Sequence, residues 1–209
     1  MKFLLSPRGP HPARARLGRS AVVLAAVAAL GAGIGASANV FATPPDDARP
    51  RVGAKAPAFV LNTADTAEPR ALDHLVRGTA TRGAVLVFVS ARCPYVAQAR
   101  QPLADLFQRY GAKVAFAGLN ANQNESASDV KTDAAHNFPF PILRDEGSKV
   151  ADLYAAERTP EVFLVDEKGV IRYHGGVAEL GAALADFTAG RPVAHAEVKA
   201  FGCTIKRKP

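Results

Sequence analysis

Two cysteines, Cys93 and Cys203, carry the most reactive side chains in this 209-residue sequence. Cys93 lies shortly after a run of apolar residues, 84–89, and just before a helical pattern. A thiol at that place faces the helix N-terminus, where free N–H groups and the helix dipole stabilise a thiolate. Arg92 places a positive charge beside it. Because only the thiolate is a good nucleophile, Cys93 is the candidate for thiol redox chemistry, and we expect its pKa to be depressed.

Cys203 leaves two interpretations open. A Cys93–Cys203 disulfide that only staples the fold would contribute about 4–5 kcal/mol of stability in the loop-entropy model. Alternatively, Cys203 reacts with Cys93 during a redox cycle. The chain from Gly190 to Cys203 extends to about 43 Å. A domain of this size has a radius of gyration of about 14–15 Å, so the tail is long enough to reach Cys93.

The elements that must position Cys93 form a strand–helix–strand unit. Residues 84–89 are a β-branched apolar run, typical of a central strand buried on both faces. Apolar residues recur at i+3 and i+4 spacing over 96–110, which predicts a helix that Pro102 should kink. A second apolar strand follows over 113–119. We therefore expect a right-handed βαβ unit with parallel strands.

The remaining elements complete an α/β domain that we expect to span residues 52–190. The sequence predicts an N-terminal hairpin at 52–74, a helix at 126–136 and an extended stretch at 138–142. A short helix at 148–156, a β-hairpin at 161–174 and a final helix at 177–189 follow. The second hairpin should consist of strands at 161–165 and 170–174, joined by a short Gly-ended loop. The tail, 191–209, carries Cys203 and has no clear periodicity.

Residues 1–38 have the pattern of an export signal. A basic stretch ending at Arg19 is followed by the apolar run 21–30, and residues 36–38 (Ala-Ser-Ala) fit a small-residue cleavage site. The apolar segment is long enough for an uncleaved membrane anchor to be the alternative. Residues 39–51 are a polar linker with adjacent prolines. We expect an exported protein, periplasmic or extracellular, tethered to the membrane if the signal is retained.

Composition and charge exclude several classes of function. The chain is 48% hydrophobic and 22% charged, so it can bury a core. The net charge of +7 is concentrated in residues 1–38, and the rest is close to balance, unlike a nucleic-acid-binding protein. There is no nucleotide-binding glycine motif and no haem-attachment motif. We expect no cofactor and no metal, because the domain's histidines lack metal-ligand spacing: His74, His136, His174 and His195.

Four motifs, in order along the chain, resemble exported thioredoxin-like proteins. Residues 52–61 (VGAKAPAFVL) are similar to the first hairpin of that family, and residues 90–94 (SARCP) to its reactive-thiol segment. Residues 158–166 (RTPEVFLVD) are similar to its cis-proline loop and the strand after it. Residues 202–206 (GCTIK) are similar to a C-terminal signature of one redoxin subgroup. The chain thus resembles the redoxins grouped with the AhpC/TSA and TlpA-type thiol–disulfide oxidoreductases.

This resemblance implies a fold and a set of site residues. The fold would be a thioredoxin-like α/β domain, a mixed sheet flanked by helices with an N-terminal hairpin extension. Pro160 would follow a cis peptide bond and face Cys93, the alternative being an ordinary trans proline. Glu161 resembles a glutamate near the active thiol of cytochrome-c-maturation thioredoxins and would shuttle protons, unless it is a solvated strand-end carboxylate. Arg158 would polarise a peroxide or steady a thiolate, unless it is a surface arginine.

Two departures from the family bear on the reaction. Classical members have Cys-x-x-Cys, and Val96 occupies the position of the second cysteine. Cys203 is then the candidate resolving cysteine, which would require a tail that docks when oxidised and releases when reduced. Peroxiredoxins carry a proline where this chain has Leu86, which weakens the interpretation as a peroxidase.

The leading interpretation is an exported thiol–disulfide oxidoreductase that uses Cys93 as its redox thiol. Its partners would be protein thiols or disulfides, or a thiol reductant, and not nucleic acid. The main alternative is a redox-silent binding or assembly module of the same fold, in which Cys93 and Cys203 form a structural disulfide. A thiol peroxidase is a lesser alternative.

Overall fold

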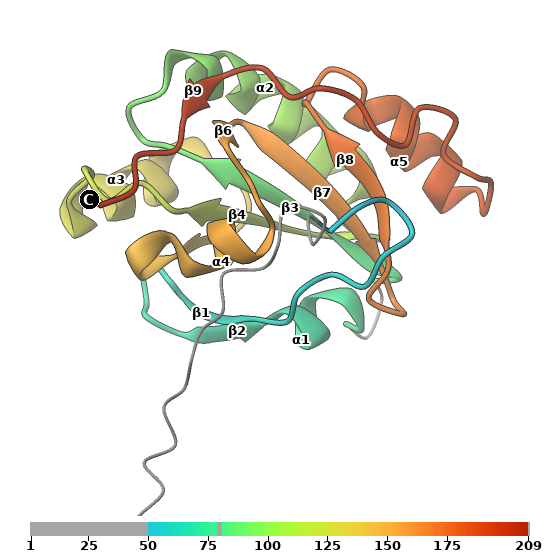
Figure 1. Ribbon diagram of the computed structural model, residues 1–209, viewed down its shortest axis with the longest axis horizontal. Coiled ribbons are helices and arrows are strands. Elements are labelled where there is room, and N and C mark those ends of the chain that lie inside the picture. Colours follow the sequence, from blue (N-terminus) through green and yellow to red (C-terminus); the bar gives the residue numbers. More distant parts are fainter. Residues whose placement is uncertain (1–49, 79–80, 209) are drawn as a thin grey trace, which may run out of the picture. The chain divides into compact units, whose positions relative to one another are not determined.

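The computed structural model describes residues 50–78 and 81–208. The predicted export signal and nearly all of the predicted linker lie outside these residues. The centre of the fold is a seven-stranded mixed sheet with the order β2-β1-β5-β4-β3-β7-β8. Strand β3 (Gly83–Val89) is parallel to β4 (Ala115–Asn120) and antiparallel to β7 (Glu161–Asp166). All residues of β3 and β7 are buried, as expected for strands covered on both faces (Figure 1).

Both predicted hairpins are present. Strands β1 (Val60–Thr63) and β2 (Pro69–Ala71) pair antiparallel, and so do β7 and β8 (Ile171–Gly175). The first hairpin does more than extend the domain, because β1 also pairs with β5 (Ile142–Arg144) and joins the main sheet. Strand β5 begins at the end of the stretch predicted to be extended, 138–142, and pairs parallel with β4.

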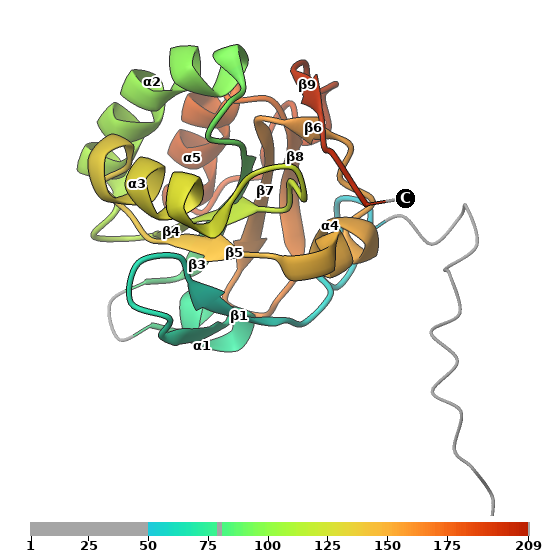
Figure 2. The same cartoon turned by 90° about the vertical axis from the view of Figure 1, so that its left-hand side faces the viewer.

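Five α-helices lie on the two faces of the sheet in the described part of the chain: α1 (Leu72–Val76), α2 (Pro94–Tyr110), α3 (Ala127–Asn137), α4 (Lys149–Leu153) and α5 (Leu180–Thr188). A short 3-10 turn, η2 (Glu146–Ser148), precedes α4. Figure 2 shows α2, α3 and α5 along one face, with α1 and α4 on the other. Helix α2 continues through Pro102 without interruption. None of the helices in the described residues is long and apolar enough to cross a bilayer.

Side chains that alternate along β3 divide the core into two layers. Leu86 and Phe88 belong to the layer under α1 and α4, whereas Val85 and Val87 belong to the layer under α2 and α5. Cys93 lies in the second layer. The fold is therefore the thioredoxin-like mixed sheet that the sequence predicts, with the reactive-thiol segment at the junction of β3 and α2.

The C-terminal tail, in which the sequence shows no periodicity, packs along the domain. Strand β9 (Cys203–Thr204) pairs antiparallel with β6 (Arg158–Thr159). Before it, the tail exchanges backbone hydrogen bonds with His174 of β8, and after it the side chain of Ile205 is buried in the core. Figure 1 shows this path in red, from α5 past β8 to β6. The sequence predicts none of this pairing, because a two-residue strand is too short to produce a period.

Candidate redox site

Cys93 lies where β3 gives way to α2. It is the N-cap residue of α2, with Pro94 in the first helical position, where the missing N–H of proline costs nothing. The Cys93 side chain is buried, with 4% of its surface exposed. Its sulfur donates a hydrogen bond to the backbone oxygen of Thr159 at 3.1 Å and lies 2.7 Å from the sulfur of Cys203, both cysteines being free thiols.

Residues that the sequence singles out in three separate motifs meet at this point. The Thr159–Pro160 peptide bond is cis, so the predicted cis proline is confirmed. Thr159 contacts the sulfur of Cys93 and is also the β-pairing partner of Cys203. Thr159, the residue before the cis proline, thus lies beside both cysteines, and the site consists of the α2 N-terminus, β6 and β9.

The pKa of the Cys93 thiol is lowered, in the direction expected from its position. Burial acts to raise the pKa, but hydrogen bonds from the Cys203 thiol, the Thr159 side chain and the backbone N–H of Val96 outweigh it. The Val96 N–H is one of the free donors at the start of α2, so the helix N-terminus contributes as expected. The buried Thr159 hydroxyl has no other hydrogen-bond partner among the described residues.

The pKa of Cys203 moves the opposite way. Burial raises it, and the hydrogen bond and the negative charge of the neighbouring Cys93 raise it further. When a single proton is shared between the two sulfurs, it therefore stays on Cys203 and the negative charge stays on Cys93.

A buried glutamate that the sequence analysis did not identify holds the segment before Cys93. One carboxylate oxygen of Glu125 accepts hydrogen bonds from the Ser90 hydroxyl and from the Arg92 N–H, at 3.2 Å in the second case. The other oxygen accepts from the Ala91 N–H at 3.1 Å and from Asn120 at 2.6 Å. A signal existed in the polar stretch 120–125, which follows β4 at the same sheet edge where β3 ends.

Neither of the two candidate arginines is hydrogen-bonded to the Cys93 sulfur. The Arg92 guanidinium forms an exposed ion pair with Asp129 at 2.7 Å, and Arg158 donates to the Thr204 hydroxyl at 3.2 Å. Arg92 is also absent from the groups that shift the pKa of Cys93. The contribution of Arg92 to the thiolate stays a prediction, and its guanidinium is paired with the Asp129 carboxylate.

Glu161 supports the backbone of the site from the opposite layer of the core. Its buried carboxylate accepts hydrogen bonds from the Glu157 N–H at 2.8 Å and the Arg158 N–H at 2.9 Å, and pairs with Nε2 of His174 at 2.8 Å. The side chain alternates with Val162, which lies in the layer of Cys93. The solvated-carboxylate alternative is wrong, and the contacts of Glu161 are with the β6 backbone rather than with the thiol.

The tail is held to the domain by contacts that do not involve the sulfur of Cys203. Its backbone is tied down on both sides of Cys203: the Ile205 N–H bonds the Glu157 oxygen at 2.9 Å, and the Lys206 N–H bonds Asn122 at 2.8 Å. Gly202 lies so close to β6 that a Cβ atom there would overlap the Thr159 carbonyl oxygen. Release of the tail on reduction stays a prediction, and it would have to break these contacts.

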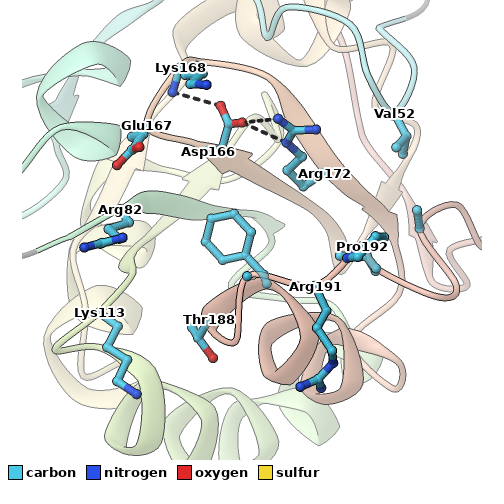
Figure 3. Close-up of a pocket in the computed structure, with 14 residues that line it drawn as sticks. Val52, Arg82, Lys113, Asp166, Glu167, Lys168, Arg172, Thr188, Arg191 and Pro192 are labelled. Carbon is cyan, nitrogen blue, oxygen red and sulfur yellow. Dashed lines mark hydrogen bonds and ion pairs between the residues drawn. The ribbon is translucent and has the colours of Figure 1, made fainter.

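Two pockets differ in their relation to this site. A groove of about 650 Å³ adjoins it and is lined by Pro160 and the exposed rings of Tyr95 and Phe201. A larger pocket of about 960 Å³ lies at the other end of β3, about 20 Å away along the strand. Figure 3 shows the charged side chains that line it, among them Arg82, and the ion pair between Asp166 and Arg172. No cluster of potential metal ligands occurs within residues 50–78 and 81–208.

Solved structures similar to this chain share its fold. An uncharacterized conserved protein from Geobacillus kaustophilus is 27% identical with a TM-score of 0.70, over 77% of this chain and 94% of that one. A hypothetical protein from Sinorhizobium meliloti 1021 is 28% identical with a TM-score of 0.68, over 75% and 94%. The peroxidoxin BcpB from Mycobacterium tuberculosis is 20% identical with a TM-score of 0.55, over 68% and 98%.

No curated protein matches the chain. The family comparison is positive: the model of the AhpC/TSA family matches residues 52–174, which is more than half of the sequence and runs from the first hairpin through β8. That span contains Cys93, Pro160 and Glu161 but ends before Cys203, so the paired tail lies beyond the part that defines the family. On this match and on its thioredoxin-like sheet, the chain belongs to the AhpC/TSA family of redoxins.

Proposed function

We propose that this protein is an exported thiol–disulfide oxidoreductase whose redox centre is the Cys93–Cys203 pair. The observation that carries the proposal is that the sulfurs of Cys93 and Cys203 lie within reach of each other, one of them at a helix N-terminus with a lowered pKa. Thiolate attack needs an ionised sulfur and a second sulfur within reach, and this arrangement supplies both. Cys203 occupies the role that Val96 cannot fill.

The substrates would be protein thiols or disulfides, or a small thiol reductant. The adjoining groove offers apolar contacts to such a partner through Tyr95 and Phe201. Export is proposed from residues 1–38 alone, and an exported location would suit a dithiol that cycles through a disulfide.

The test is equilibration of the wild-type protein in glutathione buffers, followed by acid quenching and peptide mapping. We expect a Cys93–Cys203 disulfide with a reduction potential between about −270 and −180 mV, the range from thioredoxin to protein disulfide isomerase. A potential below about −300 mV would instead favour a structural disulfide in a redox-silent binding module.

Turnover is measured as the reduction of insulin disulfides by dithiothreitol. We expect Cys93→Ser and Cys203→Ser each to lower the rate at least about 100-fold, because neither sulfur alone completes an exchange cycle. A Cys203→Ser variant with the wild-type rate of insulin reduction would refute the proposed pair. A hydrogen peroxide assay on the same variants tests the peroxidase alternative, which predicts consumption of peroxide that depends on Cys93.

A further inference from the structure

The two sulfurs of the site differ in how far solvent can reach them. Cys93 is 4% exposed, and its sulfur lies between the start of α2, the Thr159 carbonyl and Cys203. Cys203 is only partly buried and lies on the outermost strand, β9. To touch Cys93, a partner thiol would have to lift β9 from β6, against the backbone hydrogen bonds and the buried Ile205 that fix the tail.

We propose that Cys203, the tail cysteine, is the sulfur that forms the mixed disulfide with the substrate. Cys93 is the buried thiolate that leaves when this bond forms and that attacks Cys203 in the reverse reaction. This inference rests on the proposed function and reverses the roles that the sequence suggests for the two cysteines. In this order of reaction the tail cysteine contacts the substrate directly. In the order that the sequence suggests, Cys93 would contact the substrate and Cys203 would only form the disulfide with Cys93 afterwards.

The steps balance as two successive thiol–disulfide exchanges. A substrate thiolate attacks Cys203 of the oxidised protein, a substrate–Cys203 bond forms, the Cys93–Cys203 bond breaks, and Cys93 departs as a thiolate with the electron pair. A second substrate thiolate attacks the substrate sulfur of the mixed disulfide and releases Cys203, which takes up a proton. The substrate dithiol loses two electrons and becomes a disulfide. In the reverse direction, Cys203 passes its proton to the neighbouring Cys93 thiolate and attacks a more oxidising protein or small-molecule disulfide. The departing thiolate takes up that proton, and Cys93 then attacks Cys203 and releases the second thiolate, which regenerates the oxidised protein.

The chemistry of the two sulfurs agrees with this order. Exchange is faster when the leaving sulfur has the lower pKa, and the lowered pKa belongs to Cys93. The apolar groove is lined from both halves of the site: Phe201, 72% exposed, is two residues before Cys203, and Tyr95, 52% exposed, is the second residue of α2.

The test compares two single-cysteine variants with glutathione disulfide as the probe. Cys93→Ser leaves Cys203, and Cys203→Ser leaves Cys93 under a tail that remains docked. Adduct formation is followed by intact mass at a pH above both thiol pKa values, and each rate is divided by the rate of the same variant in urea. We expect the normalised rate at Cys203 to be at least ten-fold higher. Equal rates, or a faster reaction at Cys93, would overturn the proposal.

A second measurement needs no substitution. The reduced wild-type protein is treated with a limiting amount of a bulky polyethylene-glycol maleimide, and the modified peptide is identified. Cys203 should be labelled first, and labelling of Cys93 first overturns the proposal even if a variant misfolds.

Failure of the proposed function is a separate result: wild type would then form no Cys93–Cys203 disulfide in the glutathione buffers. A disulfide that forms normally, together with a faster adduct at Cys93, rejects only the order of attack.

Discussion

The two halves of the site are built by different means. The Cys93 half consists of the end of β3, the start of α2 and the carboxylate of Glu125 beneath the intervening loop. The Cys203 half consists of β9, a two-residue strand of the tail that pairs with β6. The carboxylate of Glu161 accepts hydrogen bonds from the backbone at the start of β6. The first half follows from core strands and a capped helix, whereas the second depends on contacts between segments far apart in the sequence. Perturbing the tail should therefore separate the sulfurs without moving Cys93.

Gly202→Val should separate the two halves most strongly. A Cβ at this position would overlap the Thr159 carbonyl, so β9 has to move away from β6 and carry Cys203 with it. We expect the rate of insulin reduction to fall at least about ten-fold, because Cys203 is displaced from Cys93. Far-ultraviolet circular dichroism should stay unchanged, since β3 and α2 do not involve the tail.

Gly176→Ala is the matched control for this substitution. Its added methyl group would meet only the end of the Glu179 side chain, at the ordinary contact distance of 3.7 Å. The control should retain the wild-type rate of insulin reduction. If Gly202→Val also retained it, close packing of Gly202 on β6 would not be what places Cys203.

The two buried carboxylates should respond differently to glutamine, and Glu125→Gln should be the more damaging change. Each carboxylate oxygen of Glu125 accepts two hydrogen bonds. In glutamine an NH2 group, which cannot accept a hydrogen bond, replaces one of the oxygens. It must face either the donors of Ser90 and Arg92 or those of Ala91 and Asn120. Unsatisfied buried donors and lost charge-assisted bonds together should cost about 3 kcal/mol in the free energy of unfolding. Urea denaturation measures this loss. Asp129→Asn, which weakens the exposed ion pair of Arg92 and keeps an oxygen that can accept from Ser126, is the control and should shift the urea midpoint much less.

Glu161→Gln should be milder, because glutamine can satisfy the same neighbours. Its carbonyl oxygen can accept from the Glu157 and Arg158 N–H groups while its amide group faces Nε2 of His174. We expect a loss of about 1 kcal/mol, read from urea denaturation. Hydrogen exchange of the Ile205 amide, which bonds the Glu157 oxygen, should accelerate at the same time. A loss as large as that of Glu125→Gln would contradict the assigned hydrogen bonds.

The difference between the halves also explains what the sequence could and could not predict. The continuous apolar run of β3 and the i+3, i+4 pattern of α2 place Cys93 correctly, because both signals come from local burial. The cis Thr159–Pro160 bond follows from the family motif. The roles of Glu125 and β9 were not predicted, since a buried carboxylate and a two-residue strand leave no periodic signal. Arg92 and Glu161 were assigned to Cys93 by proximity in sequence or by analogy, and tertiary partners determine their contacts instead.

The smallest expected effect concerns the hydrogen bond that Cys203 gives to Cys93. Removing this donor by Cys203→Ala should raise the pKa of Cys93, whereas Cys203→Ser keeps an O–H donor and should preserve most of the lowering. Titration of the ultraviolet absorbance of the thiolate in both variants measures the two inflections. With serine we expect an inflection below that of free cysteine, about 8.5, and with alanine a higher one.

The pH dependence of the free energy of unfolding should also differ between Cys203→Ser and Cys203→Ala, in a direction that the pKa of Cys93 determines. A thiol whose pKa is lower in the folded protein binds fewer protons there than in the unfolded chain, so its contribution to stability is present above the unfolded pKa. That contribution is lost as the pH falls through the folded pKa. The free energy of unfolding should therefore rise with pH more steeply in Cys203→Ser than in Cys203→Ala, in the window just below about 8.5. Parallel pH profiles in urea denaturation would mean that the helix N-terminus and Thr159, rather than the tail, set the ionisation of Cys93.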